Sequence, residues 1–327
     1  MKFLIVGLGS MGKRRIRNLQ FLQAGEIIGF DIQQERCKEA EEKYGIRTTS
    51  NIGSFNLAEI SAMIISTPPD HHNEWIEFAI RNGKPAFVEA SVILEGLPGL
   101  KEKADESGVL IIPSSTLHFH PAIKKIREIV AGGEYGRVLN FSYHMGQYLP
   151  DWHPWEQIGD SYTGKKETSG AREMVAFDLN WLLEITGFPD HVMGFHGKTV
   201  DFGADIDDTY AVVLKFKEAL ATFLIDTTAR YYIRHLIMNL EGAQILWRWD
   251  YRVVMLYDAG RKEWLEILLP EGNAAEGYNQ NILEEMYIEE MRAFIQAVNG
   301  KAEFPNSLER DINILRLLHQ IENRRGQ

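Results

Sequence analysis

Three glycines near the N-terminus form the pattern with the most specific chemistry in this sequence. Gly7, Gly9 and Gly12 follow the apolar run 3–6 and open a stretch with helical spacing. In this setting a G-x-G-x-x-G motif binds a dinucleotide diphosphate through backbone N–H groups and the helix dipole. Gly7 permits the tight turn, Gly9 lets the backbone approach the diphosphate, and Gly12 lets the helix lie close to the sheet. The alternative is a glycine-rich turn without a ligand. The predicted cofactor-binding residues here are Gly7, Gly9, Ser10, Met11 and Gly12.

An acidic residue follows at the distance at which such folds bind the adenosine ribose. Asp31 lies nineteen residues after Gly12, at the end of the second apolar run, 26–31. A carboxylate at this position accepts hydrogen bonds from the ribose hydroxyls and repels a 2′-phosphate. Asp31 therefore favours NAD over NADP. Lys13, Arg14 and Arg15 could favour a phosphate, but they fall within the predicted helix and we expect them to be solvated. Its alternative role, capping the next helix, does not exclude ribose binding.

The pattern of apolar and polar residues, and with it the expected secondary structure, changes along the chain. Up to about residue 119, short apolar runs alternate with helical stretches, which predicts an α/β Rossmann domain with a doubly wound parallel sheet. Beyond residue 120, strand-like runs joined by short turns predominate, including 138–148, 209–217 and 220–229. They predict a second α/β domain with a large, mostly antiparallel open sheet. We expect an NAD-binding domain over 1–119 and a substrate-binding and oligomerisation domain over 120–327.

Composition excludes several classes of protein. The chain has 327 residues, a net charge of -11 and one cysteine, Cys37. Such an acidic chain repels nucleic acid, and a lone cysteine rules out a disulfide framework and a thiolate zinc cluster. The first apolar run is too short for a signal peptide and no long apolar run follows, so we expect a cytoplasmic protein that does not enter membranes. The acidic run 205–208 has no spaced ligand set, so we expect no metal site.

Two further segments carry a family resemblance. The chain resembles the glucose–fructose oxidoreductase, inositol dehydrogenase and rhizopine-catabolism (Gfo/Idh/MocA) family. The resemblance lies in Ser-Thr-Pro-Pro-Asp-His-His (66–72) and Gly-Lys-Pro-Ala-Phe-Val-Glu (83–89), together with the glycine turn and the segments 119–121 and 136–138. The resemblance implies hydride transfer between a nicotinamide cofactor and a sugar or cyclitol, in a homodimer or homotetramer formed through the second domain's sheet. It also implies that Thr67, Pro68 and His72 line the cofactor groove and that Glu89 contacts the nicotinamide ribose.

The sequence departs from the family where the proton is usually transferred. The family follows its glutamate with lysine and proline, whereas this chain has Ala90 and Ser91. A family helix with aspartate and then histidine four residues later aligns with Glu173 and Phe177, and Asn180 stands where a further aspartate is common. Alcohol oxidation still needs a group that takes the hydroxyl proton. Candidates lie in the segment 148–173, which is rich in tryptophans and charged side chains and suits a sugar pocket. The predicted catalytic residues are Glu173, His153 and Lys166.

Three functions fit these residues. The first is an NAD-dependent dehydrogenase acting on a sugar, nucleotide sugar or cyclitol, with a relocated acid or base. The second is a lyase or glycosidase-type enzyme in which bound NAD is recycled within one turnover. The third is a regulatory protein that binds NAD or a sugar without catalysis, which the replacement of the usual lysine and histidine by Ala90 and Phe177 would explain.

Overall fold

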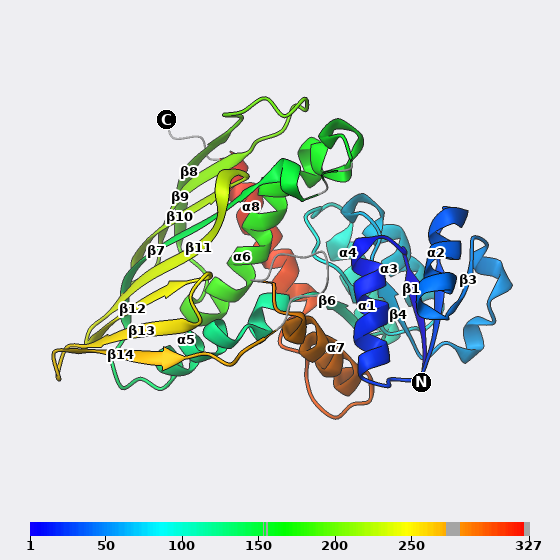
Figure 1. Ribbon diagram of the computed structural model, residues 1–327, viewed down its shortest axis with the longest axis horizontal. Helices are drawn as coiled ribbons and strands as arrows, with labels where there is room; N and C mark the ends of the chain where they lie inside the picture. The colour runs from blue at the N-terminus through cyan, green and yellow to red at the C-terminus, as the bar shows by residue number, and fades with distance from the viewer. Residues whose placement is uncertain (153, 155, 273–281, 324–327) are drawn as a thin grey trace. The chain divides into compact units, whose positions relative to one another are not determined.

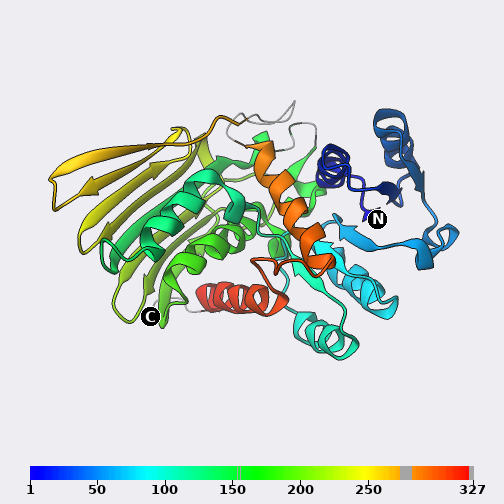
Figure 2. The same cartoon turned by 90° about the horizontal axis from the view of Figure 1, so that it is seen from below.

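The computed structural model describes residues 1–152, 154, 156–272 and 282–323 (Figures 1 and 2). The described chain forms two compact units. The first unit contains Met1–Thr116 and Glu285–Asn313. The second contains Leu117–Glu284 and the described residues from Ile314 onward. The predicted division between residues 119 and 120 stays a prediction, and the structure adds that a C-terminal segment is grouped with the N-terminal residues.

The first unit contains a six-stranded parallel sheet with the strand order β3-β2-β1-β4-β5-β6. Its strands are β1 (Lys2–Val6), β2 (Glu26–Phe30), β3 (Arg47–Thr49), β4 (Ala62–Ile65), β5 (Ala86–Val88) and β6 (Ile111–Pro113). Its helices are α1 (Ser10–Phe21), α2 (Gln34–Tyr44), α3 (His72–Arg81), α4 (Leu97–Ser107) and α7 (Glu284–Val298). A parallel sheet covered on both faces needs apolar residues at every position, as the run from Phe3 to Val6 provides. All four of these side chains are fully buried.

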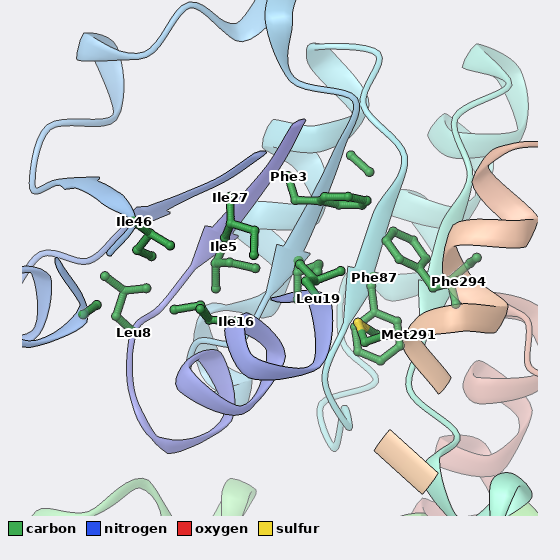
Figure 3. Close-up of a cluster of buried hydrophobic side chains, with 14 of the residues drawn as sticks. Phe3, Ile5, Leu8, Ile16, Leu19, Ile27, Ile46, Phe87, Met291 and Phe294 are labelled. Carbon is green, nitrogen blue, oxygen red and sulfur yellow. The ribbon is translucent and has the colours of Figure 1, made fainter. Parts of the chain in front are cut away.

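The main apolar cluster of this unit joins residues that are far apart in the sequence (Figure 3). Phe3 and Ile5 of β1 lie in the same cluster as Ile16 of α1 and as Met291 and Phe294 of α7. The ring centroids of Phe87 and Phe294 are 5.6 Å apart in an edge-to-face contact, an arrangement that aromatic quadrupoles favour. Helix α7 therefore completes the apolar core of the first unit.

The second unit contains an eight-stranded sheet with the order β14-β13-β12-β11-β7-β10-β9-β8. The strands are β7 (Val138–Tyr148), β8 (His191–Gly197), β9 (Thr209–Lys215), β10 (Leu220–Asp226), β11 (Thr228–Leu240), β12 (Ala243–Arg248), β13 (Val253–Asp258) and β14 (Glu263–Leu268). Neighbouring strands pair antiparallel except β7 and β10, which are parallel. The predicted fold class is confirmed for both units.

Helices cover one face of this second sheet. Helix α5 (Pro121–Ala131) contacts β13, and α6 (Gly170–Thr186) contacts β9 and β10 (Figure 1). The last helix, α8 (Leu308–Asn323), begins in the first unit and ends in the second. Alternate residues of most of these strands are buried, such as Tyr143 of β7 and Phe223 of β10, which is the period-2 pattern of a half-covered sheet. Within the described ranges, no helix is both long and apolar enough to span a bilayer.

A buried carboxyl group at the start of α8 makes the stability of the first unit sensitive to pH. Burial raises the pKa of Asp311 to about 7. The folded chain therefore holds a proton that the unfolded chain releases above about pH 4, so stability falls as the pH rises from about 4 through 7. We expect Asp311→Asn to raise the melting temperature by several degrees at pH 8.5, because it removes a penalty of up to roughly 4 kcal/mol.

The same variant should differ little from the wild type at pH 5, where both side chains are neutral. Differential scanning calorimetry at the two pH values checks this. An equal shift at both values would contradict the assigned protonation state.

Candidate functional site

The predicted cofactor residues meet at one edge of the parallel sheet. From the central pair β1 and β4, the chain continues to β2 and β3 on one side and to β5 and β6 on the other. In doubly wound sheets, ligands bind at the carboxyl ends of the strands where the order reverses in this way. The glycine turn follows β1, Asp31 follows β2, Thr67 follows β4 and Glu89 follows β5. The fold thus brings together groups separated by as many as 82 positions in the sequence.

Two of the three glycines are required by the turn itself. Gly7 has φ = +90°, and a Cβ there would lie 2.7 Å from the carbonyl oxygen of Ser66. A Cβ on Gly12 would lie 1.9 Å from the carbonyl oxygen of Gly7. In the part of the chain that the structure describes, a Cβ on Gly9 would instead have the Arg36 guanidinium as its nearest contact beyond its chain neighbours, at 3.7 Å. The fold tolerates a side chain at Gly9, so the absence of one there leaves room for a close approach by a ligand.

The helix that follows this turn is suited to phosphate. Gly9 is the N-cap of α1, and the first turn of the helix carries no acidic side chain. Ser10 is exposed and Met11 is half-buried at this end of the helix. The backbone N–H groups and the positive end of the helix dipole favour an anion at such a terminus.

Asp31 lies at the end of β2 with its carboxylate turned toward the glycine turn. Its Oδ2 accepts a hydrogen bond from the Leu8 N–H at 2.8 Å, and its Oδ1 accepts one from the Gln33 N–H at 2.8 Å. The N-cap of α2 is Gln33, so Asp31 braces the turn before the helix. A carboxylate has about four acceptor positions, which leaves two for other donors. Arg36 Nη1 lies 3.8 Å from Oδ2 and moderates the local negative charge.

The segment after β4 is joined to the segment after β5 by a histidine. Thr67 is half-buried, Pro68 is exposed and His72 is buried. His72 Nε2 lies 2.9 Å from the Thr67 carbonyl oxygen and Nδ1 lies 3.2 Å from Ser91 Oγ. A carbonyl only accepts, so Nε2 carries the hydrogen and Nδ1 accepts from the Ser91 hydroxyl. Burial lowers the pKa of His72 to about 4, which keeps the ring neutral at physiological pH.

Glu89 is held by an arginine that the sequence did not single out. Arg15 Nε donates to Glu89 Oε1 at 2.7 Å and Nη2 donates to Oε2 at 2.8 Å. Ser66 Oγ adds a hydrogen bond to Oε1 at 3.3 Å. We expected the basic residues 13–15 to be solvated, and this is wrong for Arg14 and Arg15, which are buried. Only a non-local partner such as Glu89 makes burial of the Arg15 charge tolerable.

The second unit contains the residues aligned with the family's acid and base. Glu173 and Phe177 lie one turn apart in the first half of α6 and are both half-buried, while Asn180 is buried. Glu173 can exchange a proton with a bound hydroxyl, whereas Phe177 offers only an apolar ring. The ring of Phe177 lies 5.9 Å from the Arg234 guanidinium.

The other two predicted catalytic residues are placed differently. Lys166 is exposed in the short 3₁₀ turn Lys166–Thr168, shortly before α6 begins. His153 lies outside the described residues. A buried ion pair between β11 and α6 was not predicted from the sequence. Arg234 Nε on β11 donates a hydrogen bond to Asp178 Oδ1 on α6 at 2.9 Å. Because Asp178 directly follows Phe177 in the sequence, this pair fixes α6 against the sheet beside the aligned positions.

The first unit therefore has the fold and the phosphate-binding turn of a dinucleotide-binding protein, and the second supplies a separate helix-covered sheet. Sequence comparison agrees with this class. Residues 1–114 match the family model described as the oxidoreductase family with an NAD-binding Rossmann fold, and residues 123–244 match the GFO/IDH/MocA C-terminal domain. The chain belongs to the Gfo/Idh/MocA oxidoreductase family.

Individual relatives are more distant. The chain is 28% identical over 144 residues to scyllo-inositol 2-dehydrogenase (NAD(+)) of Bacillus subtilis, a match covering 42% of each chain. This chain spans about half the length of the first three curated relatives that it matches.

Two solved structures share the fold. An oxidoreductase from Agrobacterium radiobacter in complex with NAD+, L-tartaric acid and magnesium superposes with a TM-score of 0.86 at 12% identity, covering 99% of this chain and 96% of that one. Levoglucosan dehydrogenase in complex with NADH gives a TM-score of 0.85 at 15% identity, covering 98% and 96%. At such identities the likeness concerns the fold alone.

Proposed function

We propose that this protein is an NAD-dependent oxidoreductase that transfers hydride between the nicotinamide and a hydroxyl-bearing carbon of a sugar, nucleotide sugar or cyclitol. The observation that carries the proposal is the glycine turn at the switch point of the sheet, with Asp31 directed toward it. Family membership supports hydride chemistry, and the names of inositol and levoglucosan dehydrogenases support a polyhydroxylated substrate.

The preference for NAD rests on the charge of Asp31. Its two remaining acceptor positions suit the two hydroxyls of the adenosine ribose, whereas a 2′-phosphate there would meet a buried carboxylate. Arg36 lies nearby but is partly exposed, so solvent screens its charge more strongly than that of Asp31. We propose NAD as the physiological cofactor and expect weaker binding of NADP.

Proton transfer is assigned to the second unit. When bound, the nicotinamide supplies a hydride acceptor, and the hydroxyl proton must leave to a protein group. Ala90 cannot take it, because a methyl side chain has no ionisable atom. We propose Glu173 as the general base or acid, with Lys166 and His153 as the other candidates. Tryptophans such as Trp152 would stack on the apolar face of a sugar ring.

The assembly is proposed to be a homodimer or homotetramer formed through the second sheet. Its uncovered face carries apolar side chains that are well exposed, including Phe195 (68%), Met193 (63%) and Val213 (49%). These residues lie on adjacent strands β8 and β9, with Met193 directly opposite Val213. A contiguous exposed apolar patch of this kind is typical of an interface, and sedimentation velocity would detect the oligomer.

The function is tested with purified protein, NAD or NADP, and a panel of sugars, nucleotide sugars and cyclitols. The proposal expects net NADH formation at 340 nm with at least one substrate, and tighter binding of NAD than of NADP by calorimetry. Substrate conversion without net NADH would replace it with the lyase or glycosidase function. Thermal stabilisation by NAD and a sugar without any conversion would replace it with a regulatory function.

A further inference from the structure

The first unit contains a buried cluster of three charges that includes Glu89. Besides its two hydrogen bonds to Glu89, Arg15 Nη2 lies 2.9 Å from Glu290 Oε2 on α7. Arg15 and Glu290 are fully buried, whereas 12% of the Glu89 side chain is exposed. Burial alone would lower the pKa of Arg15, but the two carboxylates outweigh it and raise that pKa. Arg15 therefore stays charged and bridges one inaccessible carboxylate to one that a ligand can reach.

Glu290, the inaccessible carboxylate of this cluster, is fixed by hydrogen bonds of its own. Glu290 Oε1 accepts hydrogen bonds from Ser114 Oγ at 2.9 Å and from the Ser115 N–H at 2.6 Å. Glu290 Oε2 accepts one from Thr116 Oγ1 at 2.8 Å. These donors follow β6, so Glu290 ties α7 to the sheet and anchors Arg15. A guanidinium fixed in this way directs its Nε and Nη2 donors toward Glu89 in one orientation.

Glu89 is thereby prepared to accept further hydrogen bonds. Arg15 occupies one position on each carboxylate oxygen, and Ser66 occupies a second position on Oε1. Oε2 keeps a free acceptor position on a side chain that is partly exposed. Among the described residues, Arg15 forms the ion pair that fixes this carboxylate, and the next residue in the chain is Ala90 where the family's pattern has a lysine. Without Arg15, the Glu89 carboxylate could therefore take other orientations.

We propose that Arg15, anchored by Glu290, is a positioning residue that holds the Glu89 carboxylate in one orientation for the ribose next to the nicotinamide. This inference rests on the proposed NAD binding. It makes a prediction that a merely structural role does not make: loss of Arg15 should weaken only those ligands that carry the second ribose. The adenosine diphosphate half is bound by the glycine turn and Asp31, which lie after other strands.

The test compares calorimetric titrations of the full chain with NAD, ADP-ribose and ADP. For Arg15→Met we expect NAD and ADP-ribose to bind about 10- to 100-fold more weakly, the effect of one charge-assisted hydrogen-bonded group. ADP affinity should stay within about two-fold of wild type. Arg15→Lys keeps the charge but not the fork, so an intermediate loss confined to NAD and ADP-ribose is expected. If Arg15→Met does not fold, Arg15→Lys still tests the inference by the same three titrations.

A matched control is Lys13→Met, because Lys13 lies on the same helix and pairs with Glu39 instead; all three affinities should be unchanged. Equal losses for all three ligands in the Arg15→Lys variant, or no loss for any of them, would overturn the inference. So would equal wild-type affinities for ADP and ADP-ribose, since the second ribose would then contribute nothing. Failure of the wild type to bind NAD would instead overturn the proposed function itself.

Discussion

Replacing Gly9 with valine is expected to weaken NAD binding at least about 100-fold while leaving the melting temperature within about 2 °C of wild type. The backbone at Gly9 is extended, with φ = -71° and ψ = -162°, a conformation that suits a β-branched residue. Apart from its chain neighbours, no atom of the described residues lies closer than 3.7 Å to a Cβ placed there. The added methyl groups therefore occupy the space that the diphosphate needs rather than space that the fold needs.

The matched control is Gly12→Ala. Its Cβ would lie 1.9 Å from the Gly7 carbonyl oxygen, so the turn must distort and the protein should lose both stability and NAD affinity. Calorimetric titration and thermal unfolding of the two variants separate the roles. Wild-type NAD affinity in Gly9→Val would remove the glycine turn from the cofactor site, and with it the main support for the proposed function.

The second large effect is expected from Glu173→Gln. The amide has the size of the carboxyl group but cannot exchange a proton, so turnover should fall about 10²- to 10⁴-fold. NAD affinity should stay within about two-fold, because the predicted cofactor residues all lie in the first unit and Glu173 lies in the second. Steady-state rates with an active substrate from the panel, together with NAD titration, check both parts.

Glu184→Gln is the control on the same helix. Glu184 Oε2 lies 2.7 Å from His118 Nδ1, and Oε1 accepts a hydrogen bond from Arg127 at 3.1 Å. This substitution should cost some stability but little turnover. If Glu173→Gln turned over at the wild-type rate, the proton-transfer role would pass to Lys166 or His153. A parallel loss of NAD binding would instead indicate that Glu173 acts on the cofactor.

The local pattern of the sequence was sufficient for most elements and for the cofactor turn. The run 138–148 was predicted as a strand and is observed as β7 with the same bounds. The glycine spacing identified a turn in which a Cβ at Gly7 or at Gly12 would collide with backbone atoms. Asp31 was predicted at the end of the second strand, where it is found. These features depend on neighbours within a few residues, and such preferences are written directly in the sequence.

Other features escaped the sequence because they depend on distant partners. Strand β14, Glu263–Leu268, was not predicted: it lies at the edge of the sheet beside β13, and none of its side chains is buried. Arg15 was read as a solvated helix residue, whereas Glu89, 74 positions away, makes its burial tolerable. From the sequence, Ser91 was noted only as a departure from the family pattern. In the structure its hydroxyl forms a hydrogen bond with His72 Nδ1.

Local residue patterns alone predict that a strand, a glycine turn and a helix create an anion-binding terminus, with an acidic residue at the end of the next strand. Which charges surround that terminus depends on tertiary contacts between distant residues. Helix α7 contributes Phe294 to the core and Glu290 to the buried charge cluster of the first unit. The physical reason is that backbone conformation is set by adjacent residues, whereas the burial of a charge depends on a partner that only the folded chain brings within hydrogen-bond distance.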